Sequence, residues 1–268
     1  MARVDLSVRY GSPGPVSGLA FSRCLALPRI RAACRAGLAG GVALLLLTAG
    51  TPLALARPSG DRYGGTLVLA TTSDPKSFND IVAKESSTTL VTGFLFVGLT
   101  TTDPFTLQVK PNLAERWEIS GNGTQWTFFL RPDVRWNDGQ PFTAADVVFT
   151  FNDLIYNDDI PSSARDIFTI EGQEFLVEKI DDYTVRFTLP VRFAPFLRAM
   201  GQAILPRHKL AAAVKNKQFS FTWGIDTDPR EIVGTGPFCL SQYRPGERLV
   251  FSANPYYRKS SGEGDQLP

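Results

Sequence analysis

The fold is decided by residues 113–153, which read LAERWEISGNGTQWTFFLRPDVRWNDGQPFTAADVVFTFND. Asn122-Gly123 is a turn pair, and the run Thr124–Leu130 after it has the β-branched and aromatic composition of a strand with both faces covered. Pro, Asp and Gly then mark turns at 131–133 and 137–141. This order predicts a buried strand that is followed by tight turns.

A helix start follows these turns. Thr143-Ala144-Ala145-Asp146 has the pattern of a capping box, in which the Thr143 hydroxyl accepts from a helix-start N–H and Asp146 reaches back to the first amide. A helix is therefore expected to begin at Thr143. Val147, Phe151 and Leu154 fall at i, i+4 and i+7, which predicts an apolar stripe that lies on the strands.

The order of these motifs resembles a known family. Leu-Ala-Glu-x-Trp, a Trp/Phe strand, Trp-Asn-Asp-Gly-x-Pro and Thr-Ala-x-Asp-Val-Val-Phe occur in residues 113–149, and Gly-Thr-Gly-Pro-Phe (234–238) and Asn-Pro-x-Tyr (254–257) follow later. This resembles the family 5 extracellular solute-binding proteins, the receptors of dipeptide, oligopeptide, nickel and haem importers of the ATP-binding-cassette type. Residues 113–153 alone also fit a generic strand–turn–helix unit, but separated matches in the right order favour the family.

The resemblance implies an α/β, periplasmic-binding-protein-like fold with two lobes that close around a ligand. In that scheme the chain holds only lobe I, built of two subdomains of mixed sheet plus helices. Residues 57–75 and 226–268 would form an incomplete central subdomain, and residues 76–225 a second one. Members of the family are about twice as long as this chain. We therefore expect the chain as given to stop before lobe II and to bind no peptide tightly.

A candidate ligand-binding stretch follows the first strand of the mature chain. Gly64-Gly65 precedes the apolar run Thr66–Thr71, and a polar loop begins at Thr72. In the family this loop reaches the ligand cleft, which makes Thr71, Thr72, Ser73 and Asp74 the candidate ligand-binding residues. An ordinary Ser/Asp/Pro loop is the alternative for each of them. In peptide-binding members the ligand main chain pairs with strand-like backbone, which makes selectivity broad.

Further elements follow from local patterns. Phe175–Ile180 and Thr184–Leu189 flank a turn and predict a hairpin with one wet face, because Val185, Phe187 and Leu189 alternate with polar residues. Helices are expected over residues 85–95, 193–200 and 207–216, and a strand over 249–253 after the Pro245–Glu247 turn.

Residues 1–56 are predicted to be an export signal. Arginines at 23, 29, 31 and 35 precede the apolar core Gly37–Ala49, and Ala54-Leu55-Ala56 is a small-x-small cleavage site. The alternative is a membrane anchor, but this core is shorter than the ~20 residues that span a bilayer. We expect cleavage near Ala56 and a periplasmic or other extracytoplasmic location. Cleavage would leave Cys239 without a disulfide partner in the chain.

Composition argues against an enzyme. The 268 residues carry a net charge of +2, which implies no partner nucleic acid. His208 is the single histidine and Cys239 is the single cysteine after the predicted leader, so His-rich or Cys-rich metal sites cannot be assembled, and we expect no catalytic residue, metal or cofactor. The carboxylate pairs at 158–159 and 181–182 lie in turn-like segments, where solvated loop carboxylates are the common case.

Competing functions can be ranked from these patterns. The first is a monomeric substrate-binding component of an importer, whose partners are a peptide or other small solute and the permease at the membrane. The second is a truncated product without ligand activity, or a lobe I docking module. An exported hydrolase that uses His208 is a distant third.

Overall fold

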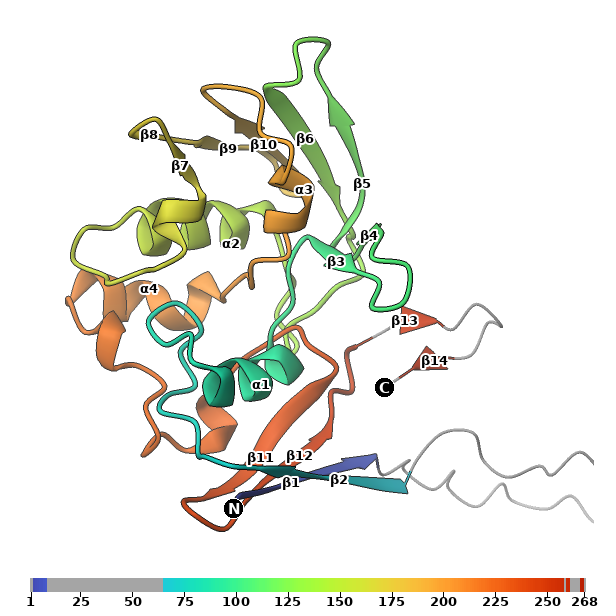
Figure 1. Ribbon diagram of the computed structural model, residues 1–268, viewed down its shortest axis with the longest axis vertical. Helices are drawn as coiled ribbons and strands as arrows, with labels where there is room; N and C mark the ends of the chain where they lie inside the picture. Colours follow the sequence, from blue (N-terminus) through green and yellow to red (C-terminus); the bar gives the residue numbers. More distant parts are fainter. Residues whose placement is uncertain (1, 9–64, 258, 261–265, 268) are drawn as a thin grey trace, which may run out of the picture. The chain divides into compact units, whose positions relative to one another are not determined.

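The computed structural model describes residues 2–8, 65–257, 259–260 and 266–267 (Figure 1). The described residues belong to one compact unit, Met1–Arg9 with Tyr63–Pro268. Apart from residues 2–8, the predicted export signal lies outside the described residues, and so does the predicted cleavage site at Ala56. In the described part of the chain, no helix combines the length and the apolar character that a membrane crossing needs.

The first sheet joins distant parts of the sequence. Its strand order is β11 (Phe238–Arg244), β12 (Arg248–Ala253), β1 (Ala2–Val8) and β2 (Gly65–Thr71) (Figure 1). β11 and β12 form an antiparallel hairpin, and β1 runs parallel to β12 and antiparallel to β2. Gly246 has φ +70° in the turn between β11 and β12, a conformation that glycine adopts without steric cost. The positions of the strands predicted before Thr72 and after the Pro245–Glu247 turn are confirmed, but β2 is largely exposed, whereas its apolar composition predicted a buried strand.

The second sheet is local in sequence and antiparallel throughout. Its order is β5 (Ala114–Ile119), β6 (Gln125–Leu130), β10 (Thr184–Thr188) and β9 (Leu176–Asp181). The β5–β6 turn is closed by the Ser120 N–H, which donates to the Gln125 carbonyl at 2.9 Å. β9 and β10 form the predicted hairpin, and along β10 the buried residues alternate with half-buried ones. The one-faced pattern of this hairpin is confirmed.

The expectation that both faces of residues 124–130 are covered was wrong. Phe128 and Leu130 are buried, whereas the neighbouring residues of β6 are only half-buried. On the outer face, the Arg116 guanidinium lies 3.4 Å from the centroid of the Phe129 ring. A long cationic side chain thus covers the second face in place of a packed layer.

The predicted helix start is confirmed. α2 (Ala144–Val148) begins after Thr143, whose backbone N–H donates to Asp146 Oδ2 at 3.0 Å within a capping box. The helix continues as the π-helical segment η1 (Phe149–Ile155), where the Tyr156 N–H donates to the Phe151 carbonyl at 2.9 Å. The predicted stripe of Val147, Phe151 and Leu154 is fully buried.

The remaining elements connect and cover the sheets. α1 (Ser86–Leu95) and α4 (Arg207–Lys215) match predicted helices, but α3 (Phe196–Ala199) is shorter than the predicted helix 193–200, because Pro195 lies at its N-cap and Gly201 follows its end. The short elements are β3 (Thr100–Thr102), β4 (Val109–Pro111), η2 (Arg165–Ile167), β7 (Thr169–Ile170), β8 (Gln173–Glu174), η3 (Phe219–Phe221), η4 (Pro229–Glu231), β13 (Lys259–Ser260) and β14 (Gln266–Leu267).

An aromatic cluster forms the centre of the core beneath the second sheet. The rings of Phe128, Phe151, Phe187 and Phe196 contact one another with centroid separations from 5.0 to 6.0 Å, mostly edge to face. All are fully buried, and each contributes about 1.5–3 kcal/mol relative to an exposed side chain. The cluster joins η1 and α3 to the strands.

The end of α1 lies against the glycines of the Gly-Thr-Gly-Pro-Phe motif. The Gly236 N–H donates to the Leu95 carbonyl at 2.8 Å. A Cβ on Gly234 would lie 2.0 Å from the same carbonyl oxygen, and one on Gly236 would lie 2.5 Å from the Phe94 oxygen. The motif therefore needs glycine because backbone meets backbone here.

Candidate functional site

The loop between β2 and α1, residues 72–85, contains the predicted ligand-binding residues Thr72, Ser73 and Asp74, and Thr71 is the last residue of β2. The Thr71 hydroxyl donates to the Ser73 carbonyl at 3.1 Å. Thr72 and Ser73 are exposed. Their hydroxyl groups are accessible to a solute, at the end of a strand whose own residues are largely exposed.

Asp74 anchors this loop to the β11–β12 turn. Its Oδ2 accepts a hydrogen bond from the Gly246 N–H at 2.6 Å. Burial raises the pKa of the Tyr243 phenol on β11, and the nearby Asp74 carboxylate raises it further. Asp74 is therefore positioned toward the hairpin, which makes it a support of the loop.

The middle of the loop is tied to residues 219–223. The Phe78 N–H donates to the Trp223 carbonyl at 2.8 Å. Asn79 is fully buried, and its Nδ2 donates to the Phe219 carbonyl at 3.1 Å while its Oδ1 accepts from the Ile81 N–H at 3.1 Å. Trp223, which has φ +53°, stacks on Phe96 with the planes 13° apart. These contacts hold the loop backbone in one conformation.

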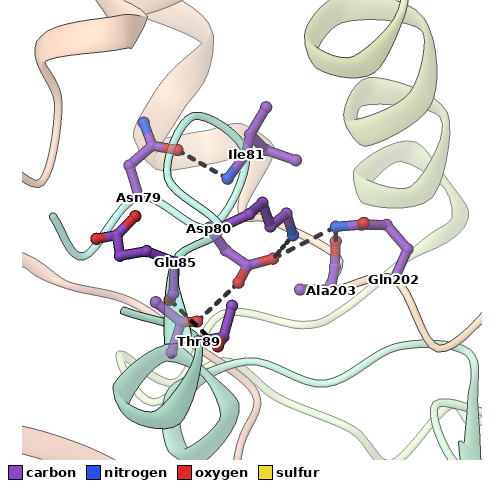
Figure 2. A network of polar contacts seen from close by, with 9 residues as sticks. Asn79, Asp80, Ile81, Glu85, Thr89, Gln202 and Ala203 are labelled. Carbon is purple, nitrogen blue, oxygen red and sulfur yellow. Dashed lines mark hydrogen bonds and ion pairs between the residues drawn. The ribbon is translucent and has the colours of Figure 1, made fainter. Parts of the chain in front are cut away.

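Asp80, which is 7% exposed, forms the centre of a polar network (Figure 2). Its Oδ1 accepts from the Thr92 hydroxyl at 2.7 Å, and its Oδ2 accepts from Lys84 Nζ at 2.7 Å and from Gln202 Nε2 at 3.4 Å. Because a buried carboxylate is costly unless it is paired and hydrogen-bonded, these donors offset its desolvation. The network connects the loop, α1 and the segment before α4.

The loop closes at its far end on the N-cap of α1. Glu85 Oε1 accepts from the Lys76 N–H at 3.2 Å and also from the Thr88 hydroxyl. The bond from Thr88 lowers the pKa of the Glu85 carboxyl, which is thus a carboxylate at neutral pH. Hydrogen bonds at both ends and in the middle thus hold the loop of residues 74–85 in place.

The residues considered for catalysis have structural roles. His208 lies in the first turn of α4, and its Nε2 is 2.8 Å from Asp138 Oδ2. Asp181 accepts from the Tyr183 N–H at 2.8 Å, and its neighbour Asp182 pairs with Lys179. Within the described residues, no group of three or more His, Cys, Asp or Glu side chains is arranged to hold a metal ion.

The motifs that carry the family resemblance contact one another. The Asn137 N–H of the Trp-Asn-Asp-Gly turn donates to the Gly234 carbonyl at 3.0 Å, and Asn137 Nδ2 donates to the Ile232 carbonyl at 3.3 Å. Asn254 Nδ2 donates to the Gly236 carbonyl at 2.8 Å. These motifs therefore form a junction that positions α1 and the loop before it.

Sequence reasoning missed the network around Asp80 and the anchoring role of Asn79. Their partners Gln202 and Phe219 are separated from them by 122 and 140 residues. The adjacent Asn-Asp pair in a loop was the available signal, but nothing in its spacing indicates distant donors.

Comparison with known proteins gives a consistent result. The model of the bacterial extracellular solute-binding proteins, family 5, matches residues 108–267. The Di/tripeptide-binding protein 4 of Pseudomonas aeruginosa is 32% identical, over 81% of this chain and 43% of its own length.

Solved structures show the same fold. NikZ of Campylobacter jejuni in complex with Ni(L-His) has 29% identity and a TM-score of 0.57, covering 71% of this chain and 36% of that protein. DppA of Helicobacter pylori in complex with the peptide STSA has 25% identity and a TM-score of 0.58, covering 73% of this chain and 40% of that protein. The chain thus spans less than half the length of these relatives.

Proposed function

Because the chain belongs to the family 5 bacterial extracellular solute-binding proteins, we propose that it acts as the substrate-binding component of an ATP-binding-cassette importer. It would capture a peptide or related small solute outside the cytoplasmic membrane and deliver it to the permease. The family match across residues 108–267, whose motifs meet at the junction before β11, carries this proposal. The relative from Pseudomonas aeruginosa, a di/tripeptide-binding protein, favours a short peptide as the solute.

The loop after β2 is the proposed ligand-contacting surface. Thr72 and Ser73 would contact the ligand through exposed hydroxyl and backbone groups, with Thr71 holding their backbone through its bond to Ser73. Asp74 would act by fixing the loop on Gly246. Strand-like backbone recognises a peptide main chain with little dependence on its side chains, so selectivity would be broad.

The arrangement of the sheets supports the proposed subdomains. β2, β11 and β12 belong to residues 57–75 and 226–268, the proposed central subdomain, whereas the second sheet lies within 76–225. We further propose that the protein is exported, with its leader cleaved near Ala56, and that it works as a monomer that contacts the permease.

Amide chemical shifts of the isotope-labelled chain would test the proposal. A pool of di- to pentapeptides and Ni(L-His) would be titrated separately. Since this chain spans less than half of its relatives, we expect millimolar affinity, about 4 kcal/mol of binding free energy. Shifts should concentrate in residues 71–85 for the peptides.

A matched pair of variants locates the site. Thr72→Ala with Ser73→Ala should weaken peptide binding severalfold, whereas Thr66→Ala, the same change on exposed β2, should leave it unchanged. Peptide-induced shifts that avoid residues 71–85 would contradict the assignment of the site. If neither ligand shifts any amide, the chain as given has no binding activity.

A further inference from the structure

A small cavity lies where the Gly-Thr-Gly-Pro-Phe and Asn-Pro-x-Tyr motifs meet the turn after β6. It measures about 30 Å³, and a cavity needs about 10–15 Å³ to hold one water molecule, so there is room for about two. Its polar lining includes Asn112, Arg131, Asp133, Arg135, Thr235 and Tyr257. The lining residue Val97 follows the C-terminal end of α1, whereas the candidate ligand-binding loop ends at the N-terminus of that helix.

Thr235 is a lining residue with an unpaired buried group. It is 3% exposed, and its Oγ1 has no hydrogen-bond partner in the part of the chain that the structure describes. The glycines on either side of it lie against the end of α1, which fixes the backbone at this position. A buried hydroxyl is costly when it is left unpaired, so a partner is expected to come from the cavity.

The charges around the cavity favour an anion. Arg131 Nε donates to Asp133 Oδ1 at 3.3 Å and its Nη2 donates to Asp133 Oδ2 at 3.0 Å, so these two side chains offset each other. Arg135 Nη1 donates to the Gly139 carbonyl at 3.0 Å, and Arg135 forms no salt bridge with another described residue. One positive charge in the lining is therefore left without a carboxylate.

The uncharged groups of the lining can all donate hydrogen bonds. Burial raises the pKa of the Tyr257 phenol, although Arg131 acts to lower it, so this hydroxyl keeps its proton at neutral pH. The Thr235 hydroxyl and the Asn112 amide are also donors. A guanidinium with hydroxyl and amide donors suits a carboxylate, whose oxygens accept only, and a carboxylate group has the size of about two water molecules.

We propose that this cavity is an anion site that takes one carboxylate group, with Arg135 supplying the charge and Thr235 a hydrogen bond. The carboxylate can belong to a small free acid or to the C-terminus of a short peptide, because both present the same atoms. A bound carboxylate would connect the turn after β6 to the Gly-Thr-Gly motif and stabilise this junction. The inference does not depend on the proposed contact of residues 71–74 with a solute, because none of them lines the cavity.

Titration of the isotope-labelled full chain tests the proposal. Sodium formate is compared with sodium chloride at equal ionic strength. A ligand of three non-hydrogen atoms binds no more tightly than about 0.5 mM, so the titration extends to about 50 mM. Formate should shift the amides of Thr235, Gly236 and Tyr257 saturably, and chloride should not. If formate shifts them no more than chloride does, the cavity holds water alone and the proposal is overturned.

Two peptides separate the sources of the carboxylate. Trialanine presents a C-terminal carboxylate, and trialaninamide lacks it. If a peptide C-terminus is the natural ligand, trialanine should shift the three amides at lower concentrations than formate does; if a free acid is, formate should act alone. Equal shifts with trialaninamide would overturn the proposal.

Matched variants assign the roles of the two residues. Thr235→Val keeps the shape of the side chain without its hydroxyl and should weaken formate binding about fivefold, whereas Thr235→Ser should bind as wild type does. Arg135→Gln removes the charge and should weaken binding about tenfold. Thr66→Val, the same change on exposed β2, is the control and should have no effect.

Denaturant unfolding with and without formate is the second measurement. Formate should raise the unfolding midpoint of wild type and of Thr235→Ser, and should raise it less for Thr235→Val and Arg135→Gln. If Thr235→Val does not fold, Arg135→Gln decides, because this side chain is exposed. Formate binding by Arg135→Gln with the affinity of wild type would overturn the proposal.

Discussion

Asp146 connects two helices through backbone amides, and its replacement should be strongly destabilising. Oδ2 accepts from the Thr143 N–H and Oδ1 from the Arg207 N–H, both at 3.0 Å, and Asp146 is 5% exposed. In Asp146→Ala both amides lose their acceptor where water has little access. Each unsatisfied buried group costs about 1–3 kcal/mol, and relief of the buried charge offsets part of this. We expect a net loss of about 3 kcal/mol in the free energy of unfolding.

Asp146→Asn separates the hydrogen bonds from the charge. The amide side chain keeps one oxygen acceptor but faces the second N–H with a donor, so a loss of about 1–2 kcal/mol is expected. Asp153→Ala is the matched control, because this exposed carboxylate follows α2 in η1. It should change stability by less than about 0.5 kcal/mol.

Denaturant unfolding, followed by tryptophan fluorescence, measures these differences at several pH values. Burial raises the pKa of Asp146, although the Thr143 and Arg207 amides act to lower it. An acid whose folded-state pKa is raised binds its proton more readily in the folded protein, so the contribution of Asp146 grows as pH falls through that pKa toward its ordinary value. The gap between wild type and Asp146→Ala should therefore not shrink from pH 7 to pH 4. A loss no larger than that of Asp153→Ala would refute the reasoning.

Other predictions concern backbone packing, charge and processing. Gly234→Ala should cost more than about 3 kcal/mol, because its Cβ meets the Leu95 carbonyl oxygen at 2.0 Å, whereas Gly93→Ala, in open space on α1, should stabilise by about 1 kcal/mol; melting curves of both variants check this contrast. For Asp138, burial acts to raise the pKa, but the hydrogen bond from the adjacent histidine and other contacts outweigh it and lower the pKa. Asp138→Asn should therefore destabilise at pH 6 and lose its effect as pH falls below the ordinary Asp range, and equal stability differences at pH 6 and pH 3 would contradict this. Mass spectrometry of exported protein should find Arg57 at the amino terminus, and an uncleaved membrane-bound chain would be the opposite result.

Local chemistry made much of the fold predictable. The capping box at Thr143, the stripe Val147–Leu154 and the hairpin around residues 181–183 all depend on neighbours within a few residues, and the structure contains each of them. The family motifs predicted the fold class, because they occur in the same order along the chain as in the family. Their mutual contacts explain why these stretches stand out in the sequence.

Long-range contacts account for what the sequence did not predict. Phe129 lies in a run whose composition predicts a buried strand, but its ring is covered only by the guanidinium of Arg116. The periodicity of the sequence does not predict this contact between two strands. A loop follows β2, as the sequence predicted, but the pairing of Asp74 with Gly246 spans 172 residues and has no local signal. The role of Ala2–Val8 as β1 had no signal, because the surrounding residues 1–56 fit an export leader.

The composition of the first sheet also sets an order of assembly during synthesis. The second sheet is complete once residue 188 has left the ribosome, since its strands lie within 114–188. β2 emerges earlier and pairs with β1, but the four-stranded sheet is complete only when β11 and β12 have emerged, and the bond from the Gly246 N–H to Asp74 closes a separation of 172 residues. Non-local strand pairing is slow, and waiting strands are prone to association. Chaperone contact with the nascent chain should therefore concentrate on residues 65–71 and end when the β11–β12 hairpin forms.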